Sequence, residues 1–108
     1  IIVCEIKPVG FKAKRLREKF DKLIGLTQQV TSKKIIEVWC ILYGAEQPQK
    51  DWPKYVYTSE FLAKYPAIKF RLKYLKVERN NIDGNTNRTH YQEFMRTKIE
   101  GLQDFFTT

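Results

Sequence analysis

A carboxylate and an ammonium group stand close together in the apolar opening of the chain, where residues 1–8 read IIVCEIKP. Because side chains alternate between the two faces of a strand, we expect Glu5 and Lys7 on the same face. The apolar run is expected to form a buried sheet strand, where charges are costly unless they are paired or used. A carboxylate can bind a hard cation such as Mg²⁺, and an ammonium beside it can neutralise a phosphate. Glu5 and Lys7 are therefore the first candidates for chemistry.

The elements around this pair are predicted to form a β-α-β unit. The opening strand ends at a turn containing Pro8 and Gly10, and apolar residues spaced three and four apart predict a helix over residues 11–29. A second apolar run, residues 35–43, is the strongest strand signal in the chain. Two strands joined by a helix and short turns are expected to be parallel, with a right-handed crossover.

The rest of the chain predicts shorter elements. They are a polar loop over residues 45–54, a short strand at 55–57, a capped helix over 58–65, a half-buried strand over 68–74, a turn-rich loop over 80–87 and a last helix from His90 to near Phe106. Basic residues alternate along the strand over 68–74, which suits a sheet edge. The expected fold class is α/β: one domain over residues 1–108 with a small mixed sheet, its β-α-β unit followed by a short helix, a strand and a C-terminal helix.

The composition indicates a basic globular domain. Lysine and arginine together number 20 against 12 aspartates and glutamates, giving a formal net charge of +8. Such a balance favours nucleic acid as partner, although a basic domain with no polyanionic partner is the alternative. The apolar runs fall short of the ~20 residues that cross a bilayer, so no membrane partner is expected. Two cysteines without short spacings indicate a reducing, intracellular compartment, cytoplasmic or nuclear.

Several other chemistries are excluded by residue spacing. The five glycines are scattered and form no phosphate-binding loop. Cys4, Cys40 and His90 lack the short ligand pairs that are typical of a zinc site, and His90 has no catalytic-triad pattern around it. Aromatic residues in the predicted strands at 55–57 and 68–74 favour a core role over a base-stacking platform.

The run VCEIKP, with its E-x-K at residues 5–7, resembles the second half of the PD-(D/E)XK nuclease core, which belongs to the restriction-endonuclease-like fold. In that family the E-x-K lies on a central strand, and a helix and a further apolar strand follow it. The resemblance covers residues 1–43. The E-[IV]-K-P form is similar to that of phage head-completion and transposon-end nucleases of this superfamily. It implies a metal-dependent nuclease that hydrolyses phosphodiester bonds with Mg²⁺ or Mn²⁺ as cofactor, and it favours DNA over RNA as substrate and partner.

The resemblance also implies a role for each residue of the E-x-K. Glu5 is expected to bind the metal, which lowers the pKa of its water and stabilises charge on the scissile phosphate. The carbonyl of Ile6 is expected to be a further metal ligand. Lys7 is expected to position or deprotonate the attacking water and to neutralise the phosphate. The basic residues expected to contact phosphates near the site are Lys12, Lys14, Arg15, Lys33 and Lys34.

The family also places an acidic residue, usually Asp, on the strand before the E-x-K, but here all four aspartates follow it: Asp21, Asp51, Asp83 and Asp104. We therefore expect a fragment or truncated core that lacks upstream elements, or a carboxylate supplied by a homodimer or a partner chain. Two alternatives remain open: a non-catalytic nucleic-acid-binding module that uses the basic helix and the strand over 68–74, and a viral or mobile-element structural subunit. In both, Glu5 and Lys7 would be an ordinary ion pair.

Overall fold

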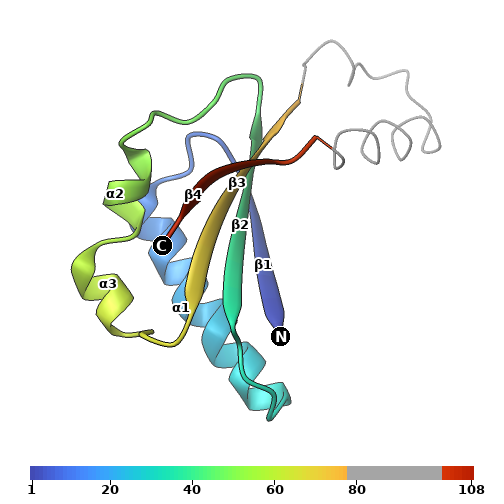
Figure 1. Ribbon diagram of the computed structural model, residues 1–108, viewed down its shortest axis with the longest axis vertical. Helices are drawn as coiled ribbons and strands as arrows, with labels where there is room; N and C mark the ends of the chain where they lie inside the picture. The colour runs from blue at the N-terminus through green and yellow to red at the C-terminus, as the bar shows by residue number, and fades with distance from the viewer. Residues whose placement is uncertain (78–100) are drawn as a thin grey trace, which may run out of the picture.

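The computed structural model describes residues 1–77 and 101–108, which form a four-stranded sheet with three helices on one of its faces (Figure 1). The elements are β1 (Ile2–Pro8), α1 (Ala13–Val30), β2 (Glu37–Gly44), α2 (Trp52–Val56), α3 (Ser59–Ala63), β3 (Lys69–Lys76) and β4 (Gln103–Thr107). Strand order follows chain order, β1-β2-β3-β4. The first three strands are mutually parallel and β4 is antiparallel to β3, which confirms a mixed sheet and the α/β class.

The β1-α1-β2 unit forms as predicted, with β1 and β2 parallel and Glu5 in register with Cys40. The turn between β1 and α1 uses Gly10 at φ +96°, a left-handed conformation that a side chain would disfavour. Helix α1 runs without a break through Gly25 and ends at Val30. The unit that carries the E-x-K is therefore a continuous strand, turn and helix.

Helix α1 is held on the sheet by a buried stripe at a spacing of four residues. Leu16, Phe20 and Ile24 are almost completely buried and pack into the cluster formed by the sheet and by α2 and α3. Burial of each side chain of this size contributes about 1.5–3 kcal/mol. The Phe20 ring lies 5.7 Å from the ring of Phe70 on β3 and 6.0 Å from that of Phe61 on α3. The stripe predicted from sequence is thus the core face of the helix.

The segment after β2 differs from its prediction. Residues 55–57 were expected to be a strand, but α2 covers Trp52–Val56, and Tyr57 follows it as the helix C-cap. Pro53 lies in the first helical turn, where a backbone N–H is not needed, so it is compatible with the helix. The next helix is confirmed, since the Thr58 hydroxyl accepts a hydrogen bond from the backbone N–H of Phe61 at the start of α3.

Strand β3 has the predicted half-buried pattern but not the predicted edge position. It pairs with β2 on one side and with β4 on the other. The expected C-terminal helix is wrong over its last residues, because Gln103–Thr107 is a strand. Pairing with β3 and stacking of the Phe106 ring 5.3 Å from that of Tyr57 override the helical periodicity. The predicted loop over 80–87 and the helix start at His90 lie outside the described residues.

No helix in the part of the chain described by the structure is long and apolar enough to cross a membrane.

Candidate functional site

Glu5 and Lys7 lie side by side on one face of β1, as the strand alternation predicted. The Lys7 Nζ is 3.3 Å from a Glu5 carboxylate oxygen, and the two side chains are 22% and 19% exposed. Val3 and Val9, which share this face, pack against the core beneath α1. The pair is therefore on the helix-covered side of the sheet, at the margin of the core and still in contact with solvent.

The surroundings of the pair combine a buried thiol and an aromatic ring. Burial raises the pKa of Cys40 to about 12, and the neighbouring charge of Glu5 is a second cause. The Lys7 Nζ lies 5.0 Å from the centroid of the Phe11 ring, and the Arg15 guanidinium lies 5.6 Å from the same centroid. Cations over an aromatic face are attracted by its quadrupole. Phe11 thus gathers two positive charges beside Glu5 at the junction of β1 and α1.

The backbone of Ile6 faces the free edge of the sheet. The Ile1 carbonyl and the Val9 N–H both bond to the β2 side, so the odd-numbered residues direct their polar backbone groups toward β2. Since successive residues of a strand point these groups to opposite sides, the Ile6 carbonyl points away from β2. No described strand pairs there. The carbonyl that the resemblance assigns to a metal is therefore accessible.

The expectation of a buried opening strand is wrong, because β1 is an edge strand within the described sheet. Strand β2 already has β1 and β3 as its two neighbours, which leaves the other side of β1 open. Ile6 is 60% exposed and Cys4 is also exposed, whereas Cys40 on β2 is buried. Pro8 fits this position, because its missing N–H would have pointed to the open side.

The predicted phosphate-contacting residues fall at the two ends of α1. Lys12 is the N-cap of the helix, and Lys14 and Arg15 are exposed in its first turn, directly after β1. Lys33 and Lys34 follow the helix at its other end. The 18 residues of α1 are about 27 Å long at 1.5 Å per residue. The structure therefore brings Arg15 close to Lys7, since both lie over the Phe11 ring, whereas Lys14 lines a pocket between α1 and α3. It does not bring Lys33 and Lys34 to the E-x-K.

The basic face of β3 is largely neutralised by ion pairs. Arg71 Nε lies 2.6 Å from a carboxylate oxygen of Glu37, and Lys73 Nζ lies 2.6 Å from one of Asp104. The hydrogen bond from Arg71 is the main cause that lowers the pKa of Glu37, and the hydrogen bond from Lys73 does the same for Asp104. Lys73 also lies 4.6 Å from the ring centroid of Trp39. This face therefore offers less free positive charge than its sequence suggested.

The aromatic residues of the later predicted strands belong to the core. Tyr57, Phe70 and Tyr74 are buried on the helix-covered side, whereas Tyr55 is 60% exposed on α2. Tyr57 and Phe70 have ring centroids 5.7 Å apart. The core interpretation is confirmed for the three buried rings, which are not available to stack on bases.

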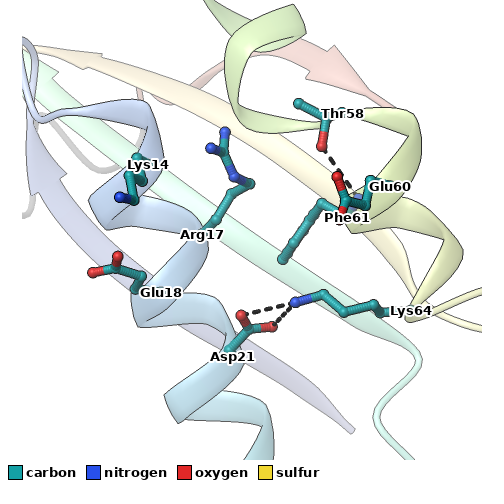
Figure 2. Close-up of a pocket in the computed structure, with 8 residues that line it drawn as sticks. All are labelled: Lys14, Arg17, Glu18, Asp21, Thr58, Glu60, Phe61 and Lys64. Atoms are coloured by element: carbon teal, nitrogen blue, oxygen red, sulfur yellow. Dashed lines mark hydrogen bonds and ion pairs between the residues drawn. The ribbon is translucent and has the colours of Figure 1, made fainter.

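A groove between α1 and α3 carries charges of both signs, and no sequence pattern predicted it (Figure 2). Lys64 on the α3 side lies 3.0 Å from the Asp21 carboxylate, and the Tyr65 hydroxyl donates a hydrogen bond to the same carboxylate. Burial and this hydrogen bond raise the pKa of Tyr65 to about 12. Arg17 donates a hydrogen bond to the backbone carbonyl of Tyr55. These contacts join residues far apart in sequence, and they fasten α2 and the C-terminal end of α3 to α1.

The residues present fit a divalent metal only in part. Glu5 and the Ile6 carbonyl offer two hard oxygen ligands of the kind that Mg²⁺ prefers. Within residues 1–77 and 101–108, no three His, Cys, Asp or Glu side chains gather closely enough to hold a metal ion. Asp21 and Asp104 are each paired with a lysine, and Asp83 lies outside the described residues. A complete site would need a further carboxylate beside β1.

Comparisons of the chain with protein-family models, with curated proteins and with solved structures gave no match. The likeness to the PD-(D/E)XK core consequently stays a resemblance, carried by the E-x-K at residues 5–7 and its β-α-β context.

Proposed function

We propose that the chain is part of a metal-dependent nuclease that hydrolyses phosphodiester bonds, with DNA favoured over RNA as the substrate. One observation carries the proposal. Glu5 and Lys7 lie 3.3 Å apart on one face of β1, and the Ile6 carbonyl between them points to the open edge of the sheet. Three groups that could serve a metal, a water and a phosphate thus lie within three consecutive residues.

Each residue has a distinct part in this proposal. Glu5 and the Ile6 carbonyl would hold Mg²⁺ or Mn²⁺, and the bound cation would supply an acidified water and stabilise charge on the phosphate. Lys7 would orient the attacking water and neutralise a phosphate oxygen. The Arg15 guanidinium, near the same Phe11 ring as Lys7, would contact the adjacent phosphate. Because a paired strand has little conformational freedom, Glu5 and Lys7 would be held ready for in-line attack.

The second carboxylate would come from a segment placed beside the open edge of β1. Ile2, Cys4 and Ile6 direct backbone N–H and C=O groups to that side, where a further strand could pair. A carboxylate on such a strand would lie next to Glu5 and the Ile6 carbonyl. The segment would belong either to the same protein or to a partner chain.

A plasmid-relaxation assay with Mg²⁺ or Mn²⁺ tests the proposal on the product of the intact gene. Glu5→Gln and Lys7→Met keep the side-chain volume and remove the charge. Each is expected to lower the cleavage rate about 10²–10⁴-fold, the range for groups that take part in proton transfer. The matched controls, Glu46→Gln and Lys50→Met, change exposed residues after β2 and should retain the wild-type rate. An inactive wild type, or full activity in both site variants, would refute the nuclease.

A non-catalytic nucleic-acid-binding module is the second candidate, and one observation favours it. In the described part of the chain, Glu5 is the one carboxylate of the E-x-K, and no three side chains gather to hold a metal. Exposed basic residues, in contrast, lie at both ends of α1. Binding with a steep salt dependence, unchanged by Glu5→Gln and never accompanied by cleavage, would select this candidate.

A further inference from the structure

A cavity of about 530 Å³ lies at the far end of α1 from the E-x-K, between the loop after α1 and the loop that leads into β3. Lys33, Lys34 and Ile35 line it from the first loop, and Lys64, Tyr65 and Ile68 line it from the second. Its volume is within the range of ligand sites, about 300–1,000 Å³. The cavity is therefore large enough for a phosphate group and the sugar attached to it.

The charge of this cavity has one sign. Three lysines line it, and none of its lining residues in the described chain is a carboxylate. Lys64 is paired with Asp21, but Lys33 and Lys34 are exposed and make no ion pair within residues 1–77 and 101–108. The groove between α1 and α3 differs, because its cations face Glu18, Asp21 and Glu60. Two uncompensated ammonium groups at one cavity favour an anion.

The loop that carries these lysines is held in place by its backbone. The Lys33 N–H donates to the Thr31 hydroxyl oxygen, and the Lys34 carbonyl accepts a hydrogen bond from the amino group of Ile1. The Ile35 side chain is buried in the core, and the Ile36 N–H bonds to the Ile1 carbonyl. A site whose backbone is already ordered loses less entropy when it binds a ligand.

We propose that this cavity binds a backbone phosphate of nucleic acid, as a second contact distinct from the E-x-K. The assignment rests on the proposed partner, nucleic acid, but not on catalysis. The Lys34 carbonyl is bonded to Ile1, which lies four strand residues before Glu5 and six before Lys7. At about 3.3 Å per residue the two positions are about 13–20 Å apart, which corresponds to about four to six phosphates along one strand at 3.4 Å each. A duplex of 20 base pairs can therefore reach both ends of α1. A mononucleotide carries the same phosphate group and is the alternative source of the phosphate bound in the cavity.

Fluorescence anisotropy with a labelled 20-base-pair duplex, in EDTA and 50 mM salt, measures binding without cleavage. The test variant is Lys33→Glu/Lys34→Glu. The control is Lys50→Glu/Lys54→Glu, which changes two exposed lysines around the start of α2. Each replacement removes one positive charge and adds one negative charge, so both double variants lower the formal charge of +8 by four. All four side chains are exposed, and circular dichroism should show wild-type folding for both proteins.

The test variant is expected to bind at least tenfold more weakly than the control. The negative slope of log K against log salt should become shallower by about 2, because two phosphate contacts are lost. Equal affinities of the two variants, or no duplex binding by the wild type, would overturn the proposal. Amide chemical shifts of residues 32–34 separate the phosphate sources. Shifts with deoxyadenosine monophosphate but none with duplex would overturn the assignment to a nucleic-acid backbone.

The lysine double variants, tested together with Glu5→Gln and Lys7→Met, separate this proposal from the nuclease. Binding that depends on Lys33 and Lys34 without any metal-dependent cleavage would refute the nuclease and support the cavity. Cleavage that depends on Glu5 and Lys7, with equal binding by the two lysine variants, would do the reverse.

Discussion

The energy of the Glu5–Lys7 contact tells how much this ion pair contributes to the stability of the fold. At 3.3 Å and an effective dielectric constant of about 20, the gross Coulomb attraction is about 5 kcal/mol. Both side chains are about one-fifth exposed, so the cost of desolvating them and of fixing their rotamers offsets most of this attraction. We expect a net coupling free energy of about 1 kcal/mol. The pair is then only a minor contribution to stability, as is usual for ion pairs that remain in contact with solvent.

A double-mutant cycle measures that coupling directly. Urea unfolding, followed by circular dichroism, gives the free energy of unfolding of the wild type, Glu5→Gln, Lys7→Met and the double variant. The double variant is expected to lie within about 1 kcal/mol of the sum of the two single changes. A coupling above about 3 kcal/mol would match a buried structural pair and contradict this reasoning. The refutation does not depend on any activity measurement.

Two further predictions concern the core and the thiols. Phe20→Ala should lower the free energy of unfolding by about 3–5 kcal/mol, because a fully buried ring is lost, whereas Leu26→Ala on the exposed side of α1 should change it by less than about 1 kcal/mol. Similar losses in urea unfolding would contradict the assigned helix face. Iodoacetamide at pH 8 should modify exposed Cys4 in the native protein and spare Cys40, since burial of the Cys40 thiol raises its pKa to about 12 and keeps it protonated. Mass spectrometry of the digested protein reads both sites, and native modification of Cys40 would contradict its burial.

The features that could be predicted from sequence are those set by short-range periodicity. The spacing of Leu16, Phe20 and Ile24 defines the buried face of α1, because residues four apart share one side of a helix. The alternation of a strand likewise places Glu5 and Lys7 on one face, whatever the strand pairs with. Their common orientation, and the β-α-β unit around them, needed no tertiary information.

The errors occur where distant contacts decide the outcome. The aromatic run of residues 55–57 has β propensity, yet the segment is helical up to Val56, and Tyr57 packs its ring against Phe70 and Phe106. Residues 103–107 fit a helical stripe but pair with β3 instead. Propensity differences amount to about 1 kcal/mol or less per residue, so packing and strand pairing override them.

The surroundings of the candidate site were likewise decided by tertiary structure. Strand alternation and composition alone establish that Glu5 and Lys7 share a face and that the chain is strongly basic. Only the fold made β1 an edge strand among the strands of residues 1–77 and 101–108, with the Ile6 carbonyl on its open side. Only the fold placed Lys33 and Lys34 beside Lys64 in one cavity. The physical reason is that periodicity reports the direction of a side chain relative to its own backbone, whereas neighbours and free edges depend on which distant segments pack together.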